Sequence, residues 1–458
     1  MKNIPLYVQI YQSLREEIRS GNRTAGEKLP SRRQMAEELG VSLSTVDNAY
    51  SQLVSEGFIE AQPQRGFFVC AIDEMASLRL EETETPLGIQ PLPSVEVDFS
   101  TSGVAAEAFP YNQWRRLLRG AFDECDATLL DCPPAQGDPQ LREWIARYLR
   151  QARGVRCDAR QVVVGAGTEH LLQILSYLLD NRFTLAMEDP VYHGMADYFI
   201  RMGHPVRTIA MDEQGVIPGL LEGLHRTALY ITPSHQFPLG FTMPIGRRVQ
   251  LLNWAGEGQE RYIIEDDYDS EFRYHTRPVP SLQSIDPHGR VIYLGTFSKS
   301  VAPSLRIGYM VLPGALLEIY RQKYAAFSSA VSGLEQKVLV EFLRSGQFQT
   351  HLNRMRNLYR QRREALSAAL GRYDGQLEIG GEMAGHHLLV RDRRGRPEAE
   401  LCQRALDAGV RVYPIARYFA GPMPPRYQST VLLGYGALPA EKIRRGVEKL
   451  ALAWELET

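Results

Sequence analysis

Residues 296–309 read TFSKSVAPSLRIGY and follow directly on the apolar run Val291-Ile292-Tyr293-Leu294. The run predicts a buried strand, which places Lys299 at a strand end. Burial there would lower the pKa of the lysine amine toward the nucleophilic form that a Schiff base needs. A lone lysine in this position is more often an exposed charge. Ser298, Thr296 and Arg306 favour a reactive lysine instead, because hydroxyls and a guanidinium are groups that hold a phosphate.

A second apolar run ends in carboxylates and a phenol, since residues 262–268 read YIIEDDY. Open α/β sheets bind their ligands at such strand ends. The two stretches together resemble the pyridoxal 5'-phosphate site of fold-type-I aminotransferases, and more closely that of the MocR-type (GabR-like) transcriptional regulators. By position, the resemblance implies that Asp266 pairs with the pyridinium nitrogen and keeps it an electron sink. It also implies that Tyr268 reaches the ring hydroxyl, that Lys299 forms the internal aldimine, and that Arg306 and Thr296 hold the phosphate.

A glycine-containing turn adds candidates for the phosphate. Residues 161–164 predict a strand, and residues 165–170 (GAGTEH) lead directly into a helix. Free backbone N–H groups and the helix dipole at such a turn attract an anion, so Gly167 and Thr168 are expected at the cofactor phosphate. Many turns of this kind hold no ligand. Further along, the resemblance implies that Tyr192 stacks on the pyridine ring, which suits a flat, electron-poor heterocycle.

Two features depart from an efficient aminotransferase. The loop at residues 230–240 reads YITPSHQFPLG, and Phe237 replaces the asparagine of the usual Asn-Pro-x-Gly motif. That asparagine would bond the ring hydroxyl, which leaves His235 or Gln236 to compensate. Aminotransferases also place an arginine for the substrate carboxylate near the last strand, where this chain has Leu432-Leu433.

The carboxylate of an effector has another candidate partner. Arg417 is the best alternative by position in the regulator family, and a guanidinium fork matches a carboxylate bidentately. Arg411 and Arg426 lie nearby in the sequence, and any of the three could be an exposed loop charge.

The first 70 residues have a different pattern. Apolar residues at helical spacing predict three helices, each followed by a glycine, and two short strands then flank the turn at residues 62–66. This order describes a winged helix-turn-helix whose third helix would enter the major groove. The segment resembles the GntR family in residues 29–36 (LPSRRQMA), Val41-Ser42, Thr45-Val46 and the wing glycine Gly66.

By analogy with that family, Ser31 and Arg33 would touch phosphate, and Ser44 and Thr45 would lie at the groove. Arg65 would project from the wing beside Gly66. The family often has arginines where this chain has Leu43 and Asp47-Asn48, but Leu43 could contact a thymine methyl and Asn48 an adenine. Residues 1–70 hold eight Lys or Arg and eight Asp or Glu, so electrostatics does not independently indicate DNA. A winged helix used only for protein contacts is the minor alternative.

The 458 residues exceed the size of one domain. We expect a DNA-binding domain at 1–70, an acidic, proline-containing linker at 71–94, and an aminotransferase-like domain at 95–458. Alternating apolar runs and helical patterns in the last segment predict a mainly parallel sheet flanked by helices. The expected fold class is therefore α/β: a winged helix-turn-helix plus the large and small domains of fold type I.

Composition narrows the class of protein further. The net charge of −2 argues against a generally polycationic nucleic-acid binder, and no apolar stretch approaches the ~20 residues of a membrane span. The N-terminus lacks a signal-peptide core, which predicts a cytoplasmic protein. The five cysteines form no CxxC pair, so neither a disulfide framework nor a metal site is expected, and they are interpreted as small buried hydrophobes.

The resulting hypothesis is a homodimeric transcriptional regulator. It would bind operator DNA and sense an amino compound, or pyridoxal phosphate itself, through Lys299. The candidates γ-aminobutyrate, taurine, other amino acids and the cofactor stay open. The chief rival is a working aminotransferase with an accessory DNA-binding domain, and a third possibility is a C-terminal domain that serves only as a dimerisation scaffold. We do not expect a physiological enzyme, although weak transaminase activity is compatible with the retained residues.

Overall fold

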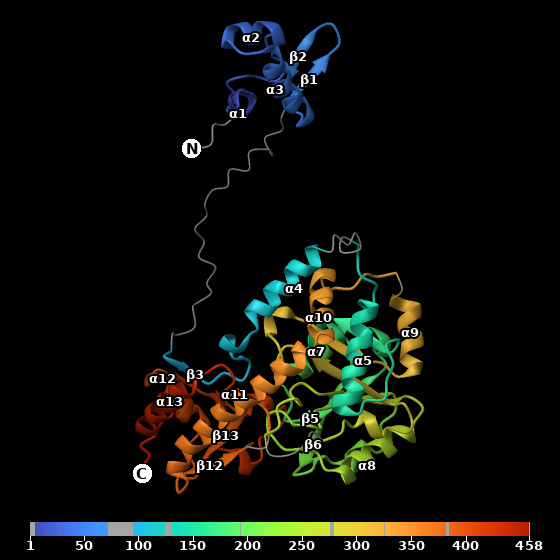
Figure 1. The fold of residues 1–458 in the computed structure, drawn as a ribbon, viewed down its shortest axis with the longest axis vertical. Coiled ribbons are helices and arrows are strands. Elements are labelled where there is room, and N and C mark those ends of the chain that lie inside the picture. The colour runs from blue at the N-terminus through green and yellow to red at the C-terminus, as the bar shows by residue number, and fades with distance from the viewer. Residues whose placement is uncertain are drawn as a thin grey trace. The chain divides into compact units, whose positions relative to one another are not determined.

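The structure, a computed structural model, describes residues 5–71, 95–123, 131–192, 194–274, 279–324, 326–381 and 384–457. The chain divides into two compact units, Met1–Leu92 and Pro93–Thr458 (Figure 1). Apart from Ala71, the predicted linker at 71–94 lies outside the described residues. None of the described helices combines the length and the apolar character that a bilayer crossing demands.

The N-terminal unit is a three-helix cluster with a hairpin. Its elements are α1 (Leu6–Arg19), α2 (Arg32–Leu39), α3 (Leu43–Ser55), β1 (Ile59–Gln62) and β2 (Gly66–Val69). The side chain of Ser31 caps α2, and the side chain of Ser42 caps α3. Gly40 ends α2 with φ 62°, a left-handed conformation that suits glycine. Leu39, the last residue of α2, is 50% exposed although it is apolar.

The core of this unit joins all of its elements. Tyr50 of α3 is fully buried and donates a hydrogen bond of 3.0 Å to the carbonyl oxygen of Pro30, which fixes α3 against the start of α2. The buried apolar residues are Leu14, Ile18, Leu29, Met35, Ala36, Val46, Tyr50, Leu53, Ile59 and Val69. The helices and the hairpin therefore share one small core, as a winged helix-turn-helix requires.

The C-terminal unit is built on a large, mainly parallel sheet. Within the described residues, eight strands lie in the order β4-β11-β10-β9-β8-β5-β6-β7, with β11 and β7 antiparallel to their neighbours. They are β4 (Val162–Gly165), β5 (Thr184–Asp189), β6 (Val206–Asp212), β7 (Gly215–Val216), β8 (Thr227–Ile231), β9 (Arg261–Asp266), β10 (Val291–Thr296) and β11 (Gly308–Val311). The predicted α/β class and the mostly parallel sheet are confirmed.

Helices cover both faces of this sheet because its central strands are apolar on both sides. In β9, for example, Ile264 packs in a core with α6 and α9, whereas Ile263 packs in a core with α8. The helices of this large domain are α5 (Pro139–Arg153), α6 (Thr168–Leu179), α7 (Met195–Arg201), α8 (Ile245–Gly256), α9 (Gly314–Tyr324) and α10 (Gly333–Arg344).

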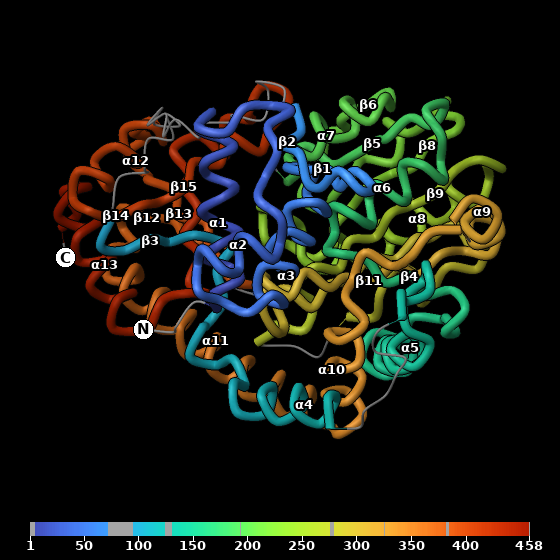
Figure 2. The backbone as a smooth tube through the Cα atoms, turned by 90° about the horizontal axis from the view of Figure 1, so that it is seen from above, coloured from blue at the N-terminus to red at the C-terminus, as the bar shows by residue number. Residues whose placement is uncertain are grey.

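A smaller domain follows the long helix α11 (Gln347–Leu370). Its antiparallel sheet has the order β12-β13-β16-β15. Figure 2 shows β3 beside the C-terminal elements, and β3 pairs in parallel with β14, so the start of this unit belongs to the small domain. The remaining elements are β3 (Val97–Asp98), α4 (Tyr111–Asp123), β12 (Leu377–Gly380), β13 (His387–Asp392), α12 (Glu398–Asp407), β14 (Val410–Arg411), β15 (Tyr413–Pro414), β16 (Thr430–Gly434) and α13 (Ala440–Ala453).

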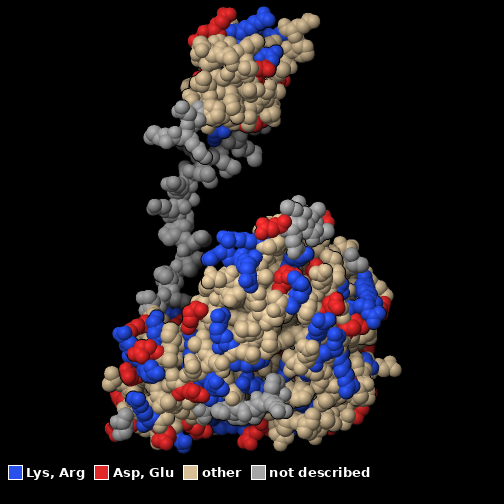
Figure 3. All heavy atoms as spheres, viewed as in Figure 1, with Lys and Arg blue, Asp and Glu red and all other residues tan. Residues whose placement is uncertain are grey.

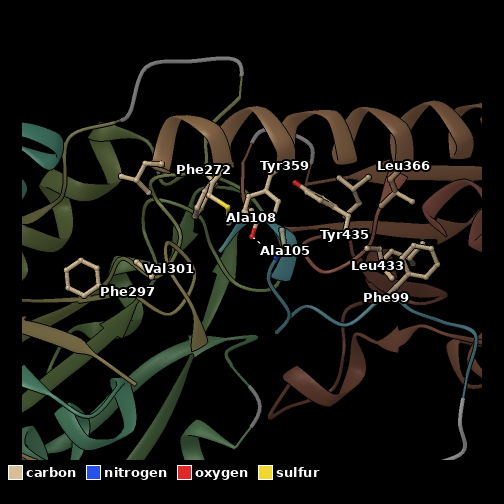
Figure 4. Close-up of a cluster of buried hydrophobic side chains, with 14 of the residues drawn as sticks. Phe99, Ala105, Ala108, Phe272, Phe297, Val301, Tyr359, Leu366, Leu433 and Tyr435 are labelled. Atoms are coloured by element: carbon tan, nitrogen blue, oxygen red, sulfur yellow. Dashed lines mark hydrogen bonds between the residues drawn. The ribbon is translucent and has the colours of Figure 1, made fainter. Parts of the chain in front are cut away.

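One apolar core connects the large and small domains along α11. Tyr359 and Leu366 point from this helix toward Phe272 of the large domain and Leu433 of the small domain (Figure 4). The hydroxyl of Tyr359 accepts a hydrogen bond of 3.2 Å from the N–H of Ala105. The helix therefore ties both domains to the first residues of the unit.

The surface of the C-terminal unit carries both signs of charge. Lys, Arg, Asp and Glu are interspersed over the face shown in Figure 3, in keeping with the net charge of −2. The expectation of buried cysteines holds for Cys157 and is wrong for Cys132, which is exposed; Cys70 and Cys402 are half-buried, and Cys125 lies outside the described residues. Cys132 lies before the start of α5 and is not among the residues of the buried core.

Candidate functional site

The sheet topology brings the two key sequence stretches together. Strands β9 and β10 run parallel, with Asp266 opposite Leu294, so their carboxyl ends lie at the same edge. Strand β11 links β10 to β4, because Gly308 pairs with Thr296 on one side and with Gly165 on the other. The lysine stretch, the acidic stretch and the glycine turn thus meet at one edge of the sheet, although the sequence separates them widely.

A cavity of about 410 Å³ opens at this edge. It is lined by eight of the residues singled out from the sequence: Thr168, Tyr192, Asp266, Tyr268, Thr296, Lys299, Arg306 and Arg417. Gly167 lies against it, since a Cβ at that position would come within 2.7 Å of Arg306 Nη2. All nine candidates for the cofactor and the effector therefore lie in or beside one cavity.

Lys299 is held at the cavity wall by a backbone contact. Its Nζ donates a hydrogen bond of 2.7 Å to the carbonyl oxygen of Thr101. Burial lowers the pKa of the amine to about 8, and the negative charge of Asp269 opposes that shift. A larger share of this amine is neutral at physiological pH than in an ordinary lysine, which is the condition for attack on an aldehyde.

Asp266 is a buried carboxyl group at the end of β9. Burial raises its pKa to about 7, and a hydrogen bond donated by the Tyr230 hydroxyl to Oδ2 opposes the rise. A cation beside such a carboxyl would restore its charge, because opposite charges in a buried site favour both ionised forms. The protonated nitrogen of a pyridine ring is a cation of the right kind.

The next residue, Asp267, is occupied by a buried ion pair. Arg153 Nε lies 2.7 Å from Asp267 Oδ2, and Tyr293 and Ser270 donate to the same oxygen at 2.5 and 2.8 Å. Although burial alone would raise the pKa of Asp267, the Arg153 guanidinium keeps it below its ordinary value. Of the two adjacent aspartates, Asp266 thus faces the cavity and Asp267 anchors the strand end from behind.

The phenol of Tyr268 is supported by a histidine and a carboxylate. His235 Nδ1 lies 3.0 Å from Tyr268 Oη and 2.8 Å from Asp269 Oδ2. With its proton on Nδ1, the imidazole donates to the nearer acceptor, the Asp269 carboxylate. Burial, the negative charge of Asp269 and a hydrogen bond to that carboxylate raise the pKa of the Tyr268 phenol well above its ordinary value. Gln236, the other residue considered in place of the missing asparagine, donates instead to the carbonyl oxygens of Pro190 and Phe237, at 3.0 and 2.7 Å. Of the two residues, His235 contacts the phenol of Tyr268, and neither lines the cavity.

The phosphate end of the cavity combines a cation, hydroxyls and a helix N-terminus. Gly167 has φ 84° and immediately precedes α6, so the first amides of that helix face this end. Thr296 Oγ1 lies 2.9 Å from Ser298 Oγ and accepts from the Ser298 N–H at 3.1 Å, and Arg306 forms an ion pair with Glu169. The close approach of Arg306 to Gly167 leaves no room for a Cβ. These donors fit the phosphate of pyridoxal phosphate.

The small domain also contributes to the cavity wall. Arg417 lies in the short 3₁₀ helix Ala416–Tyr418 and lines the cavity. The two alternatives do not line it: Arg411 contacts Asp98 at 3.2 Å, and Arg426 lies 4.0 Å from Glu213. Among the three arginines, the fold thus favours Arg417 for the carboxylate of a ligand.

Two aromatic residues contribute to the cavity wall. Tyr192 is 56% exposed and lines the cavity, which leaves its ring face open to a planar ligand. Phe237 also lines it, 5.8 Å from Tyr192 between ring centroids, and presents hydrocarbon where an aminotransferase has an amide. The substitution seen in the sequence therefore falls inside the cavity.

Several lining residues were not found from the sequence. Tyr230 is the last residue but one of β8 and could have been found from its place near the strand end. Thr101, in contrast, acts through its backbone and leaves no signal in the sequence. His386 lies just before β13 and His387 is its first residue. The sequence around both histidines reads as an ordinary strand and gave no sign of a ligand site. Within the described residues, no group of three or more His, Cys, Asp or Glu side chains is placed to hold a metal ion.

In the N-terminal unit, most of the predicted DNA contacts are accessible. Arg33, Ser44, Asn48 and Arg65 are exposed, and Thr45 is half-buried with its hydroxyl 2.7 Å from Ser42 Oγ. The other two have structural tasks: Ser31 accepts a hydrogen bond from the N–H of Gln34 as the cap of α2, and Gly66 opens β2 with φ 110°. A serine that caps a helix can still present its exposed hydroxyl to phosphate.

The acidic residue of the third helix has a partner. Asp47 forms an ion pair with Arg32 of α2, and both side chains are about half exposed. The pair reduces the repulsion that a free carboxylate would exert on a phosphate backbone. The sequence pattern alone did not indicate this pairing.

Two families match the chain in succession. Residues 6–69 match the bacterial regulatory proteins of the gntR family, and residues 105–450 match aminotransferase class I and II. The boundary between the matches falls where the structure divides.

Similar proteins match most of the chain. Over 454 residues the chain is 39% identical to an uncharacterised HTH-type transcriptional regulator, YhdI, of Bacillus subtilis, covering 98% of this chain and 96% of the relative. It is 34% identical to the probable rhizopine catabolism regulatory protein MocR of Rhizobium meliloti, and the match covers 99% of this chain and 94% of the relative. Among solved structures, a multiple substrate aminotransferase from Thermococcus profundus matches 84% of this chain and 97% of its own, with TM-score 0.71 and 25% identity.

Proposed function

Because the chain belongs to the MocR-type transcriptional regulators, in which a GntR-family DNA-binding domain is fused to an aminotransferase-like domain, we propose that it binds pyridoxal phosphate on Lys299 and senses an amino compound there. The protein is a DNA-binding transcriptional regulator, and its larger domain has the fold of pyridoxal-phosphate-dependent aminotransferases. The single observation that carries the proposal is the position of Lys299, whose amine of lowered pKa shares one cavity with Asp266 and Arg306.

Each cavity residue would contribute one interaction. Bound pyridoxal phosphate supplies an aldehyde that condenses with amines and a ring that withdraws electrons. Lys299 would offer its neutral amine to that aldehyde, and Asp266 would hold a proton on the ring nitrogen. Tyr268 would donate to the ring oxygen, supported by His235 from behind.

The two ends of the cavity would bind the anionic groups. Arg306, Thr296, Thr168 and the amides after Gly167 would hold the phosphate. Tyr192 would cover the ring, and Arg417 would fix the carboxylate of the incoming amino compound. The cofactor itself remains an alternative effector, because the same residues would bind it reversibly.

Regulation requires that the effector bind two arrangements of the protein with different affinities. A ligand that joins Lys299 and Arg306 of the large domain to Arg417 of the small domain would favour the closed arrangement of these domains. We propose that this closure is transmitted to the DNA-binding domains of a homodimer, which would face two half-sites of an operator. As a chromosomal DNA-binding protein, it would act in the cytoplasm.

A working aminotransferase is the second candidate, favoured by the retained Lys299, Asp266 and Tyr268. Phe237 in the cavity and the buried leucines of β16 argue against efficient turnover, because neither supplies the polar contact of an aminotransferase. Incubation with amino acids and an oxo-acid acceptor separates the two candidates. A regulator is expected to transfer the amino group of an amino acid only once per protein molecule, or slowly. Sustained multiple turnover would favour the enzyme.

The cofactor proposal is tested by trapping. Borohydride treatment of the cofactor-saturated full chain, followed by peptide mapping, should label position 299 and no other lysine. The Lys299→Ala variant, mixed with pyridoxal phosphate, should lack the visible absorbance that the wild type shows with the cofactor. An unlabelled position 299, or a colourless wild type, would contradict the proposal and favour a dimerisation scaffold.

The DNA proposal is tested by titrating DNA from upstream of the chain's own gene, with and without pyridoxal phosphate and amino acids. Arg65→Ala should weaken binding to all DNA sequences. It should also reduce the slope of the logarithm of the binding constant against the logarithm of the salt concentration by about one. Asn48→Ala should instead cost about 1–3 kcal/mol at one base position and relax the preference there. Equal binding of the wild type to upstream and scrambled DNA, unaffected by any ligand, would contradict an operator-binding role.

A further inference from the structure

One buried histidine in the cavity lacks hydrogen-bond partners. His386 is 2% exposed, lines the cavity, and neither Nδ1 nor Nε2 makes a hydrogen bond within the part of the chain that the structure describes. The neighbouring His387, in contrast, has its Nε2 2.9 Å from the carbonyl oxygen of Pro238. A buried polar group without a partner is costly, so a native site that keeps one invites an explanation through a ligand.

Two aromatic rings pack against the imidazole of His386. The ring of Phe272 meets it edge-on at 4.5 Å between centroids, and the ring of Tyr359 does so at 4.4 Å. Both aromatic residues belong to the core drawn in Figure 4. The Tyr359 hydroxyl already accepts from the N–H of Ala105, so these neighbours hold the imidazole in place without pairing its nitrogens. The cavity, which also contains Lys299, borders the ring.

The imidazole is neutral in this environment. Burial lowers the pKa of His386 well below its ordinary value, and the nearby Lys299 and the imidazoles of His235 and His387 lower it further. A neutral imidazole has one N–H donor and one acceptor nitrogen. A hydrocarbon ligand would pair neither nitrogen, an anion would pair only the donor, and a cation would pair only the acceptor. A neutral group that both donates and accepts could pair with either.

We propose that His386 is a specificity residue for the effector, and that the effector is an amino acid whose side chain carries a neutral hydroxyl or carboxamide group. The inference rests on the proposed function and deepens it, because Lys299 and Arg417 would meet the amine and the carboxylate that all amino acids share. His386 would then recognise what distinguishes one amino acid from another. It acts by binding and takes no part in bond making.

The test uses matched probes on the cofactor-loaded full chain. The pairs are L-serine with L-alanine, L-homoserine with L-2-aminobutyrate, and L-asparagine with L-leucine, and the readout is the change in the visible absorption of the cofactor. The polar member of at least one pair should bind about three- to tenfold more tightly, the range expected for a neutral hydrogen bond. His386→Phe keeps a ring of similar size and should remove the preference, whereas His386→Asn, which has both a donor and an acceptor, should retain part of it.

The outcomes distinguish a failure of this inference from a failure of the proposed function on which it rests. A cofactor-loaded wild type without a visible band would contradict binding at Lys299, and the inference would fall with it. A normal band with equal affinities in all three pairs, or a preference that survives in His386→Phe, would overturn the inference alone. The urea midpoints of His386→Phe and His386→Asn, compared with that of the wild type, serve as the folding control.

Discussion

The amine of Lys299 lies 2.7 Å from the carbonyl oxygen of Thr101, a residue 198 positions earlier in the chain. The contact joins the loop after β10 to the segment that follows β3, which belongs to the small domain through its pairing with β14. The lysine is therefore positioned by two parts of the fold, and a movement of the small domain would change its surroundings. Such a link suits a residue that reports ligand binding.

The lowered pKa of Lys299 predicts how cofactor attachment depends on pH. With a pKa of about 8, the neutral fraction of the amine rises up to pH 8 and then levels off. The rate at which the visible band develops after mixing with pyridoxal phosphate should rise about tenfold per unit at low pH and flatten above pH 8. Stopped-flow absorbance between pH 6 and 10 measures this. A rate that still rises at pH 10 would show that the pKa of Lys299 is that of an ordinary lysine. The Lys299→Arg variant should show no increase in visible absorbance at any pH.

Replacement of Gly167 should weaken cofactor binding specifically. Gly167→Ala places a Cβ 2.7 Å from Arg306 Nη2 at φ 84°, so the guanidinium must move away from the phosphate position. Gly203→Ala is a matched control, since Gly203 has φ 86° and only Asn181 nearby at 3.7 Å. Both variants should lose about 1–3 kcal/mol of stability to backbone strain. Only Gly167→Ala should lose affinity for pyridoxal phosphate in an absorbance titration, and equal losses would contradict the role of Arg306.

The hydrogen bond from Tyr230 should set the pH range of cofactor binding. Asp266 must be ionised to hold the protonated ring nitrogen, so affinity should fall as pH drops below about 7, the pKa of the unliganded carboxyl group. Tyr230→Phe removes a donor to the charged form and should move the midpoint to higher pH, on the order of one unit. Dissociation constants measured from pH 5.5 to 9 provide the readout.

Tyr293→Phe is the control for that experiment, because its hydroxyl donates to Asp267 and lies behind the cavity edge. It should leave the midpoint unchanged. A shift of the same size in Tyr293→Phe, or none in Tyr230→Phe, would show that the direct bond to Asp266 is not what sets the pH range.

The buried pair of Arg153 and Asp267 should matter for stability. Arg153→Met leaves the Asp267 carboxylate without its counter-ion and should cost about 3–5 kcal/mol, seen as a lower urea midpoint. Arg160→Met provides the comparison, since Arg160 pairs with Asp158 at the surface and its loss should leave the midpoint unchanged. If both variants unfolded at the wild-type midpoint, Arg153 would not support the strand end as described.

Much of this protein could be predicted from local sequence patterns. The helices, caps and wing of the first unit follow from apolar spacing, Ser31 and the glycines, all of which act within a few residues. The alternation of strands and helices likewise gave the α/β class, and strand ends marked Asp266 and Lys299. Local patterns failed at surfaces: they did not show that Leu39 and Cys132 are exposed, since burial depends on what lies opposite.

The tertiary structure decided the contacts between distant residues. Sequence reasoning left His235 and Gln236 as equal candidates, and only the fold shows that the phenol of Tyr268 lies beside His235. The partners of Asp266, Asp267 and Lys299, namely Tyr230, Arg153 and Thr101, come from separate elements. The short-range periodicities by which a sequence is interpreted carry no information about such pairs, because chain folding alone brings them within hydrogen-bond distance. For the same reason, the unpaired imidazole of His386 became visible only once its neighbours were known.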